Sequence, residues 1–169
     1  IVQVLDTPLG KVVNPQATPV TEFSSSNLIT KPFGQGQFVL MRMPAAIMKG
    51  SLPNGLSYEE ILKTDKASLA YQDLGFKGAA VAGPFVTGAL LKGPLVSGAK
   101  EFQMIVYSDA EFASNQLLYK NLNRDLALNT VSYLAKEENI ISISPKEVNV
   151  TQLQMTDTQF YIFIFAFII

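Results

Sequence analysis

The residues best placed for chemistry are two carboxylates that follow an apolar stretch. Asp109 and Glu111 come just after residues 101–107, whose β-branched and aromatic side chains predict a strand. Open α/β sheets place their ligand crevices at the carboxyl ends of strands, so this position favours a binding site. Two carboxylates there could hold Mg²⁺ or act as an acid and base pair. The structural alternative is that Asp109 caps the following turn while Glu111 faces solvent.

A second polar group opens the helix that the sequence predicts. Asn123, Arg124 and Asp125 are consecutive, and Arg124 could hold an anionic ligand or the carboxylate of a partner. The structural alternative is that the triplet caps the helix, because Asn123 is a good N-cap and Asp125 suits the positive end of a helix. We treat five residues together as a candidate interaction loop: Asp109, Glu111, Asn123, Arg124 and Asp125.

The composition excludes several classes of chemistry. The chain contains no Cys and no His, which excludes thiol nucleophiles, Ser-His pairs, and thiolate or imidazole metal sites. It contains neither a phosphate-binding P-loop nor a GxGxxG fingerprint. A net charge of −1 gives no basic surface for nucleic acid. The sequence therefore predicts a protein that is not an enzyme, with no catalytic residues, metal, cofactor or nucleic-acid partner.

The elements that must position these residues form a strand-helix-strand series. Residues 101–107 predict a strand, residues 123–136 a helix and residues 139–143 a further strand. In the helix, apolar residues recur with a 3.6-residue period, which predicts a buried face made of Ala127, Leu128, Val131, Leu134 and Ala135. We therefore expect an α/β fold with a partly parallel sheet and flanking helices.

The first hundred residues predict further strands. Residues 1–5 and 37–43 are apolar runs closed by a nearby Pro, and the first of them resembles a strand already in progress. We therefore expect the fold to be incomplete at its N-terminus. A hydroxyl and two acids at Ser57, Glu59 and Glu60 predict a short helical turn. Glycines recur every five residues from 78 to 98, which we interpret as two buried strands with glycines at turns and close backbone approaches.

The C-terminal residues predict a membrane anchor. Residues 160–169 are all apolar or aromatic and follow a polar stretch. A spanning helix needs roughly 20 apolar residues, so we interpret residues 158–169 as the start of a transmembrane helix and residues 1–157 as the domain that it anchors. The alternative is a buried C-terminal strand. No Lys or Arg lies between Lys146 and the apolar run, and because cytoplasmic flanks tend to be basic, this pattern predicts a domain outside the cytoplasm.

Several segments resemble a known family. Residues 105–115 (IVYSDAEFASN) and 121–147 (NLNRDLALNTVSYLAKEENIISISPKE) resemble the signature of the GldG-like gliding-motility proteins, also called the auxiliary component of ABC transport systems. Residues 26–34 (SNLITKPFG) and 60–71 (EILKTDKASLAY) resemble two further stretches of that family. The chain departs from the family's pattern at Ser108, Glu111 and Tyr133, where the family has Gly, Asp and Trp.

The resemblance implies both a fold and a function. The fold would be an extracytoplasmic α/β domain related to glutamine-amidotransferase-like or flavodoxin-like folds, without their catalytic residues. A helix would anchor it in the cell inner membrane, on the periplasmic side, beside an ABC permease and an ATPase that are separate chains. Our leading hypothesis is thus a non-catalytic auxiliary subunit that acts by protein or substrate interaction. The alternatives are a carboxylate-dependent hydrolase and a carbohydrate-binding sensor, both using Asp109 and Glu111.

Overall fold

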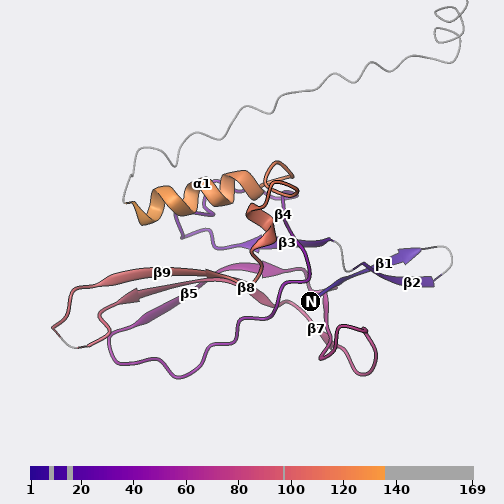
Figure 1. Ribbon diagram of the computed structural model, residues 1–169, viewed down its shortest axis with the longest axis horizontal. Helices are drawn as coiled ribbons and strands as arrows, with labels where there is room; N and C mark the ends of the chain where they lie inside the picture. Colours follow the sequence, from indigo (N-terminus) through magenta and orange to yellow (C-terminus); the bar gives the residue numbers. More distant parts are fainter. Residues whose placement is uncertain (8–9, 15–16, 97, 136–169) are drawn as a thin grey trace, which may run out of the picture.

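The computed structural model describes residues 1–7, 10–14, 17–96 and 98–135, which contain nine strands and two helical elements (Figure 1). The strands are β1 Gln3–Thr7, β2 Gly10–Asn14, β3 Thr18–Phe23, β4 Val39–Met41, β5 Ser57–Thr64, β6 Leu69–Ala70, β7 Val81–Ala82, β8 Val86–Gly93 and β9 Phe102–Tyr107. The helical elements are the 3-10 helix η1, Glu111–Ala113, and the α-helix α1, Asn123–Leu134. The predicted strand at residues 139–143 and the predicted membrane helix at residues 158–169 lie outside the described residues.

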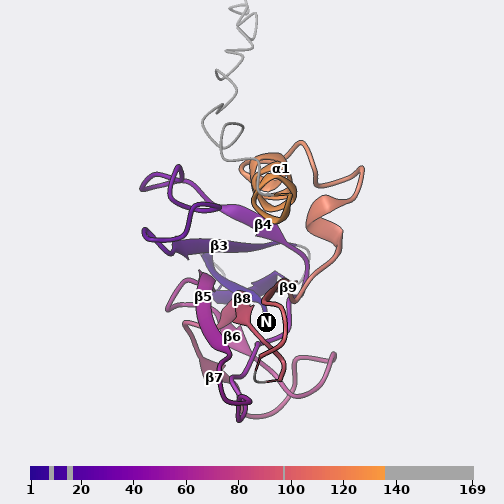
Figure 2. The same ribbon diagram turned by 90° about the vertical axis from the view of Figure 1, so that its left-hand side faces the viewer.

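Five of the strands form one sheet in the order β4-β3-β5-β8-β9. Every neighbouring pair in this sheet is antiparallel. The sheet curls into a half-barrel, and α1 lies over its open side with η1 beside it (Figure 2). The two-stranded ribbons β1-β2 and β6-β7 lie at one end of the sheet. The two edge strands β4 and β9 therefore both approach the helical elements, which contact each of them.

The expectation of a partly parallel α/β sheet, and with it a flavodoxin-like or glutamine-amidotransferase-like fold, is wrong. All strand pairs among the described residues are antiparallel. Parallel neighbours need crossover connections of a dozen or more residues, usually helical. Here β8 and β9 are joined by residues 94–101 and pair directly as a hairpin, and the single described α-helix follows the last described strand.

The helical turn predicted from Ser57 onward is also wrong, because these residues begin β5. This strand lies in the middle of the sheet and pairs with both β3 and β8, so two ladders of hydrogen bonds outweigh a local preference for a helix start. Its pairing with β8 shifts register on both sides of Leu62. The irregularity allows the consecutive residues Ile61 and Leu62 both to be fully buried, whereas regular strands alternate their faces.

The glycine-rich stretch contributes one buried strand instead of the two predicted. β8 is buried over much of its length, whereas β7 has two residues and both are exposed. The interpretation of the glycines as close approaches is confirmed at Gly88, which pairs with Leu62. A Cβ atom at Gly88 would lie 2.9–3.0 Å from side-chain atoms of Leu62, which is closer than real Cβ contacts.

The core fills the space between the curled sheet and the helical elements. Most of its residues come from the central strands, and η1 and α1 add Phe112 and Leu126. The buried cluster consists of Val20, Ile29, Val39, Met41, Ile61, Leu62, Leu90, Phe112, Leu122 and Leu126. Burial of these apolar side chains holds the helical elements over the open side of the half-barrel.

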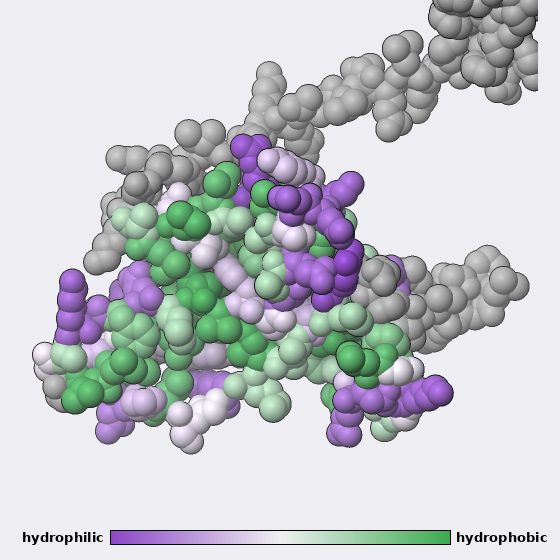
Figure 3. Space-filling view, viewed as in Figure 1, coloured by the Kyte–Doolittle hydropathy of each residue, from purple (hydrophilic) through white to green (hydrophobic). Residues whose placement is uncertain are grey.

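The predicted helix is confirmed, but the prediction of its buried face is wrong. α1 buries Asn123, Leu126 and Ser132, whereas Leu128, Val131 and Leu134 are 50%, 66% and 44% exposed. The inner face is largely polar because it meets backbone groups, which need hydrogen-bonding partners when they are buried. Apolar residues consequently gather on the outer surface over α1, where Figure 3 shows them next to hydrophilic residues over the loop that follows η1.

Candidate functional site

Asp109 lies just beyond β9 and is buried, with 9% of its surface exposed. Its Oδ1 accepts a hydrogen bond from the N–H of Glu111 at 2.8 Å, which confirms the structural alternative that Asp109 caps the following turn. Its Oδ2 accepts a second bond, also 2.8 Å, from the N–H of Arg42, just beyond β4. Asp109 therefore ties the end of one edge strand to the end of the other.

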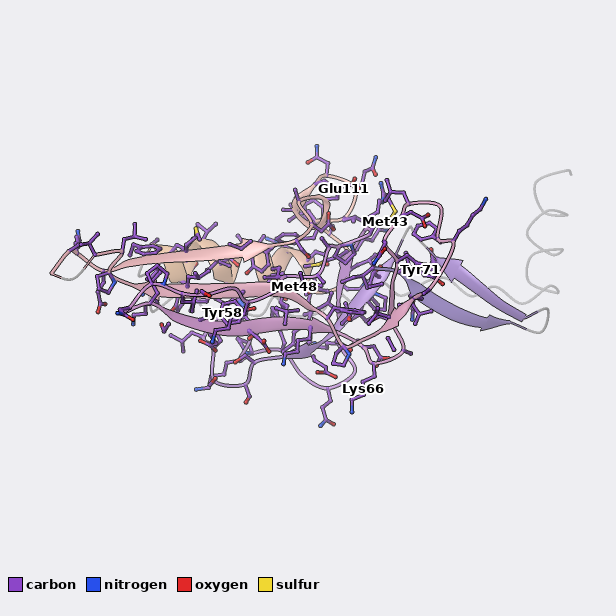
Figure 4. The ribbon with its side chains drawn as sticks, turned by 90° about the horizontal axis from the view of Figure 1, so that it is seen from below. Met43, Met48, Tyr58, Lys66, Tyr71 and Glu111 are labelled. Carbon is purple, nitrogen blue, oxygen red and sulfur yellow. The ribbon has the colours of Figure 1, made fainter. Side chains whose placement is uncertain are left out.

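Glu111 lies at the surface, at the start of η1 (Figure 4). Its carboxylate forms an ion pair of 2.8 Å with Arg42, and the two side chains are 50% and 28% exposed. The Arg42 guanidinium also donates to Oε1 of Gln116 at 3.4 Å. Because ion pairs at this exposure add little stability, Glu111 supports the joint between β4 and β9 only weakly.

Asn123 is fully buried and does not cap the helix, contrary to the prediction. The N-cap position belongs to Leu122, which makes no side-chain capping bond. The Asn123 Oδ1 accepts from the N–H of Leu40 at 2.7 Å, and its Nδ2 donates to the carbonyls of Leu40 and Phe112 at 2.9 and 3.0 Å. The side-chain amide thus pairs with the edge of β4 as a neighbouring strand would, and it also binds the end of η1.

Arg124 and Asp125 do not join this buried group. Arg124 is exposed and Asp125 is partly buried. Burial raises the pKa of Asp125, and the nearby Arg124 guanidinium partly offsets this. Of the five predicted residues, the structure thus brings Asp109 and Asn123 into the closing joint and leaves Glu111 and Arg124 at the surface.

The occupied oxygens of Asp109 limit what this loop can do chemically. A metal ion or substrate would have to compete with backbone N–H groups for both oxygens of Asp109. Glu111 is paired with Arg42. No group of three or more His, Cys, Asp or Glu side chains that could hold a metal ion occurs in the part of the chain that the structure describes.

Sequence analysis missed a polar cleft between the end of β3 and the middle of β5. It has a volume of about 290 Å³ and is lined by Glu22, Phe23, Ser24, Ser25, Ser26, Glu60, Ile61 and Lys63. Lys63 and Glu60 form an ion pair of 2.6 Å, and this hydrogen bond raises the pKa of Lys63. Hydroxyl and charged groups of this kind can bind a small polar molecule. The serine run of residues 24–26 was the only sequence signal for it.

A carboxylate next to this cleft holds the serine loop in place. Glu59 accepts hydrogen bonds from the hydroxyls of Ser24 and Ser26 at 2.9 and 3.4 Å, and from Nδ2 of Asn27 at 3.0 Å. The same charge adds to burial in raising the pKa of Tyr133 on α1. Glu59 therefore links β5 to the loop that packs beneath α1.

Tyr107, the last residue of β9, anchors α1 to the sheet. Its hydroxyl lies 2.6 Å from the hydroxyl of Thr130, and its ring packs edge-on against Phe112 with centroids 5.1 Å apart. Burial raises the pKa of Tyr107 to about 12, because the tyrosinate anion would lose its hydration, and the bond from Thr130 opposes this to a smaller extent.

We expect the absorbance of tyrosinate to show one late step, with a midpoint at about pH 12, that is missing in Tyr107→Phe. The folded-state pKa lies above the ordinary value of 10.0, so the folded chain binds this proton more tightly between these values. The stabilisation is fully present below pH 10.0 and is lost as the pH rises through about 12. Tyr119→Phe, which removes an exposed phenol, should keep the late step; its loss in that variant would contradict the assignment.

No protein-family model, no curated protein and no solved structure matches the chain. Functional inference therefore starts from the site and from the resemblance of the signature segments. Among the described residues, no helix combines the length and the apolar character that crossing a membrane would require.

Proposed function

We propose that this protein is a non-catalytic auxiliary subunit of an ABC transport system, of the GldG-like kind. Residues 158–169 start the anchor in the cell inner membrane, and residues 1–157 form a domain on the periplasmic side. The domain acts by binding other proteins or the transported substrate. ATP is hydrolysed by a separate ATPase chain, and a separate permease chain forms the membrane channel.

The observation that carries this proposal is the use to which the signature residues are put. Asp109 and Asn123 are the most buried polar residues of the signature segments, and their hydrogen bonds go to backbone groups of β4, η1 and the turn after β9. Side chains used in this way hold a domain together and leave its outer surface for contacts. The absence of Cys and His from the whole sequence agrees with a binding role.

Affinity capture of the full chain from its native cells tests the proposal. The chain should be found in the membrane fraction, and extraction with a mild detergent should recover an ABC permease and an ATPase, identified by mass spectrometry. The matched control ends at residue 157. It should leave the membrane fraction and lose most of the captured permease, because the anchor no longer keeps the two proteins in one membrane.

Three outcomes would overturn the proposal. The first is a full chain that is soluble in water without detergent. The second is capture that recovers neither transporter subunit. The third is hydrolysis of a small molecule by the purified chain alone, which would favour the carboxylate-dependent alternative at Asp109 and Glu111.

A further inference from the structure

The outer surface of α1 carries apolar side chains that nothing among the described residues covers. Leu128 is 50%, Val131 66% and Leu134 44% exposed, and they lie on the side of α1 away from the sheet (Figures 2 and 3). Ala127 and Ala135 lie beside them on the helix. We call these five residues the outer stripe. Monomeric proteins seldom expose a continuous apolar helix face, so the outer stripe points to a partner.

The outer stripe is symmetric about its central residue. Leu128 and Leu134 lie three residues before and after Val131, and Ala127 and Ala135 lie four residues before and after it. The stripe therefore presents the same order of side chains in both chain directions. A second copy of α1 that runs antiparallel would meet it with matching residues, which is the requirement for an interface with twofold symmetry.

The charges flanking the outer stripe are opposite in sign. Arg124 lies seven residues before Val131 and Glu138 seven residues after it. Fourteen residues are two heptads, the spacing that returns to the same side of paired helices. Glu138 lies outside the described residues, so its part in this inference comes from the sequence spacing alone. In an antiparallel pair each Arg124 would face Glu138 of the other copy, whereas a parallel pair would place Arg124 beside Arg124.

We propose that α1 is the contact between two copies of this chain, which meet through the outer stripe with antiparallel helices and a twofold axis at Val131. Leu128 of each copy packs against Leu134 of the other. Ala127 and Ala135 allow the two helix axes to approach closely. An interface of one helix per copy is small, so the association is weak and is best detected by crosslinking. This contact goes beyond the proposed function and does not depend on the transport partners.

Single-cysteine variants of the full chain test this contact, because the natural chain has no Cys. Val131→Cys places a thiol on the twofold axis, and a short bis-maleimide reagent spans the gap between two helices. Met48→Cys is the matched control, because Met48 is 87% exposed and lies on the face of the sheet away from α1 (Figure 4). We expect at least about tenfold more crosslinked dimer from Val131→Cys. Equal yields from the two variants would overturn the proposal.

Charge reversal tests the antiparallel orientation. In the Val131→Cys background, Arg124→Glu and Glu138→Arg should each lower the dimer yield several-fold, because each places like charges face to face. The double variant restores both pairs with their signs exchanged and should recover the yield. A double variant that stays monomeric would overturn the proposal, provided that circular dichroism shows an intact fold. Slow labelling of Val131→Cys by a one-armed maleimide in the monomer would also overturn it, because another segment of the chain would then cover the stripe.

Discussion

Replacing Asn123 with alanine is expected to lower the free energy of unfolding by about 4 kcal/mol. The side chain is fully buried and makes three hydrogen bonds, two with Leu40 and one with Phe112. Alanine would leave three backbone groups without partners in the interior and would also create a cavity. Urea denaturation followed by circular dichroism measures the loss as a lower midpoint with an unchanged slope.

Two further variants show whether the hydrogen bonds or the filled volume matter at this position. Asn115→Ala removes an exposed amide and should change the stability by less than about 0.5 kcal/mol. Asn123→Asp keeps the volume and the acceptor for the N–H of Leu40, but it turns an oxygen toward the two carbonyls. It should be at least as destabilising as Asn123→Ala. If Asn123→Ala were as stable as Asn115→Ala, the amide could not be what joins α1 to β4.

Features that depend on neighbours in the sequence could be predicted. The strand at β9 and the helix at α1 follow from β-propensity and from a run free of Gly and Pro. The turn cap at Asp109 is similarly local, because its acceptor oxygen and the N–H of Glu111 are two residues apart. Each of these features rests on interactions within one turn or one strand.

The order and direction of the strands could not be predicted in the same way. Strand-helix-strand patterning was interpreted as a parallel unit, but pairing is decided by which strands meet across the whole chain. The helix face failed for a related reason. Its apolar period identified the outer stripe, whereas the inner face is held by polar contacts such as those of Thr130 with Tyr107 and of Asn129 with the carbonyl of Ile29.

The joint between the sheet edges was invisible in the sequence because its partners are far apart. Leu40 and Asn123 are 83 residues apart, and Arg42 and Asp109 are 67 residues apart. Nothing near Arg42 in the sequence indicates that its N–H would be taken by a carboxylate. The candidate residues were therefore found from their types, whereas their roles appeared only when the fold brought β4 to them.

The half-barrel is closed by side chains instead of by strand pairing. β4 has three residues, so it exposes only a short edge, and the amide of Asn123 occupies it. Short and covered edges resist unwanted pairing with other chains. Because buried polar contacts work only in one geometry, the closure also fixes where α1 lies and thus which of its faces points outward. The exposure of the outer stripe is in this sense a consequence of the buried Asn123.

Asp109→Ala is expected to lower the free energy of unfolding by about 3 kcal/mol, because hydrogen bonds to a charged acceptor are worth more than neutral ones. Both oxygens of Asp109 are used, one by the N–H of Glu111 and one by the N–H of Arg42. Alanine would leave both N–H groups without their acceptor and would release β4 from the end of β9. The same urea titration measures the loss, and hydrogen exchange of the Arg42 amide reports on the joint directly.

Asp73 provides a matched control because it makes the same local bond without the distant one. Its Oδ1 accepts from the N–H of Gly75 at 2.7 Å in an exposed turn, so Asp73→Ala removes a turn cap alone and should cost about 1 kcal/mol or less. The difference between the two variants then measures the link to Arg42. Glu111→Gln, which removes only the exposed ion pair, should also cost less than about 1 kcal/mol. If Asp109→Ala cost no more than Asp73→Ala and left exchange at Arg42 slow, Asp109 would be a simple turn cap, and the closure of the half-barrel would depend on Asn123 and the apolar core.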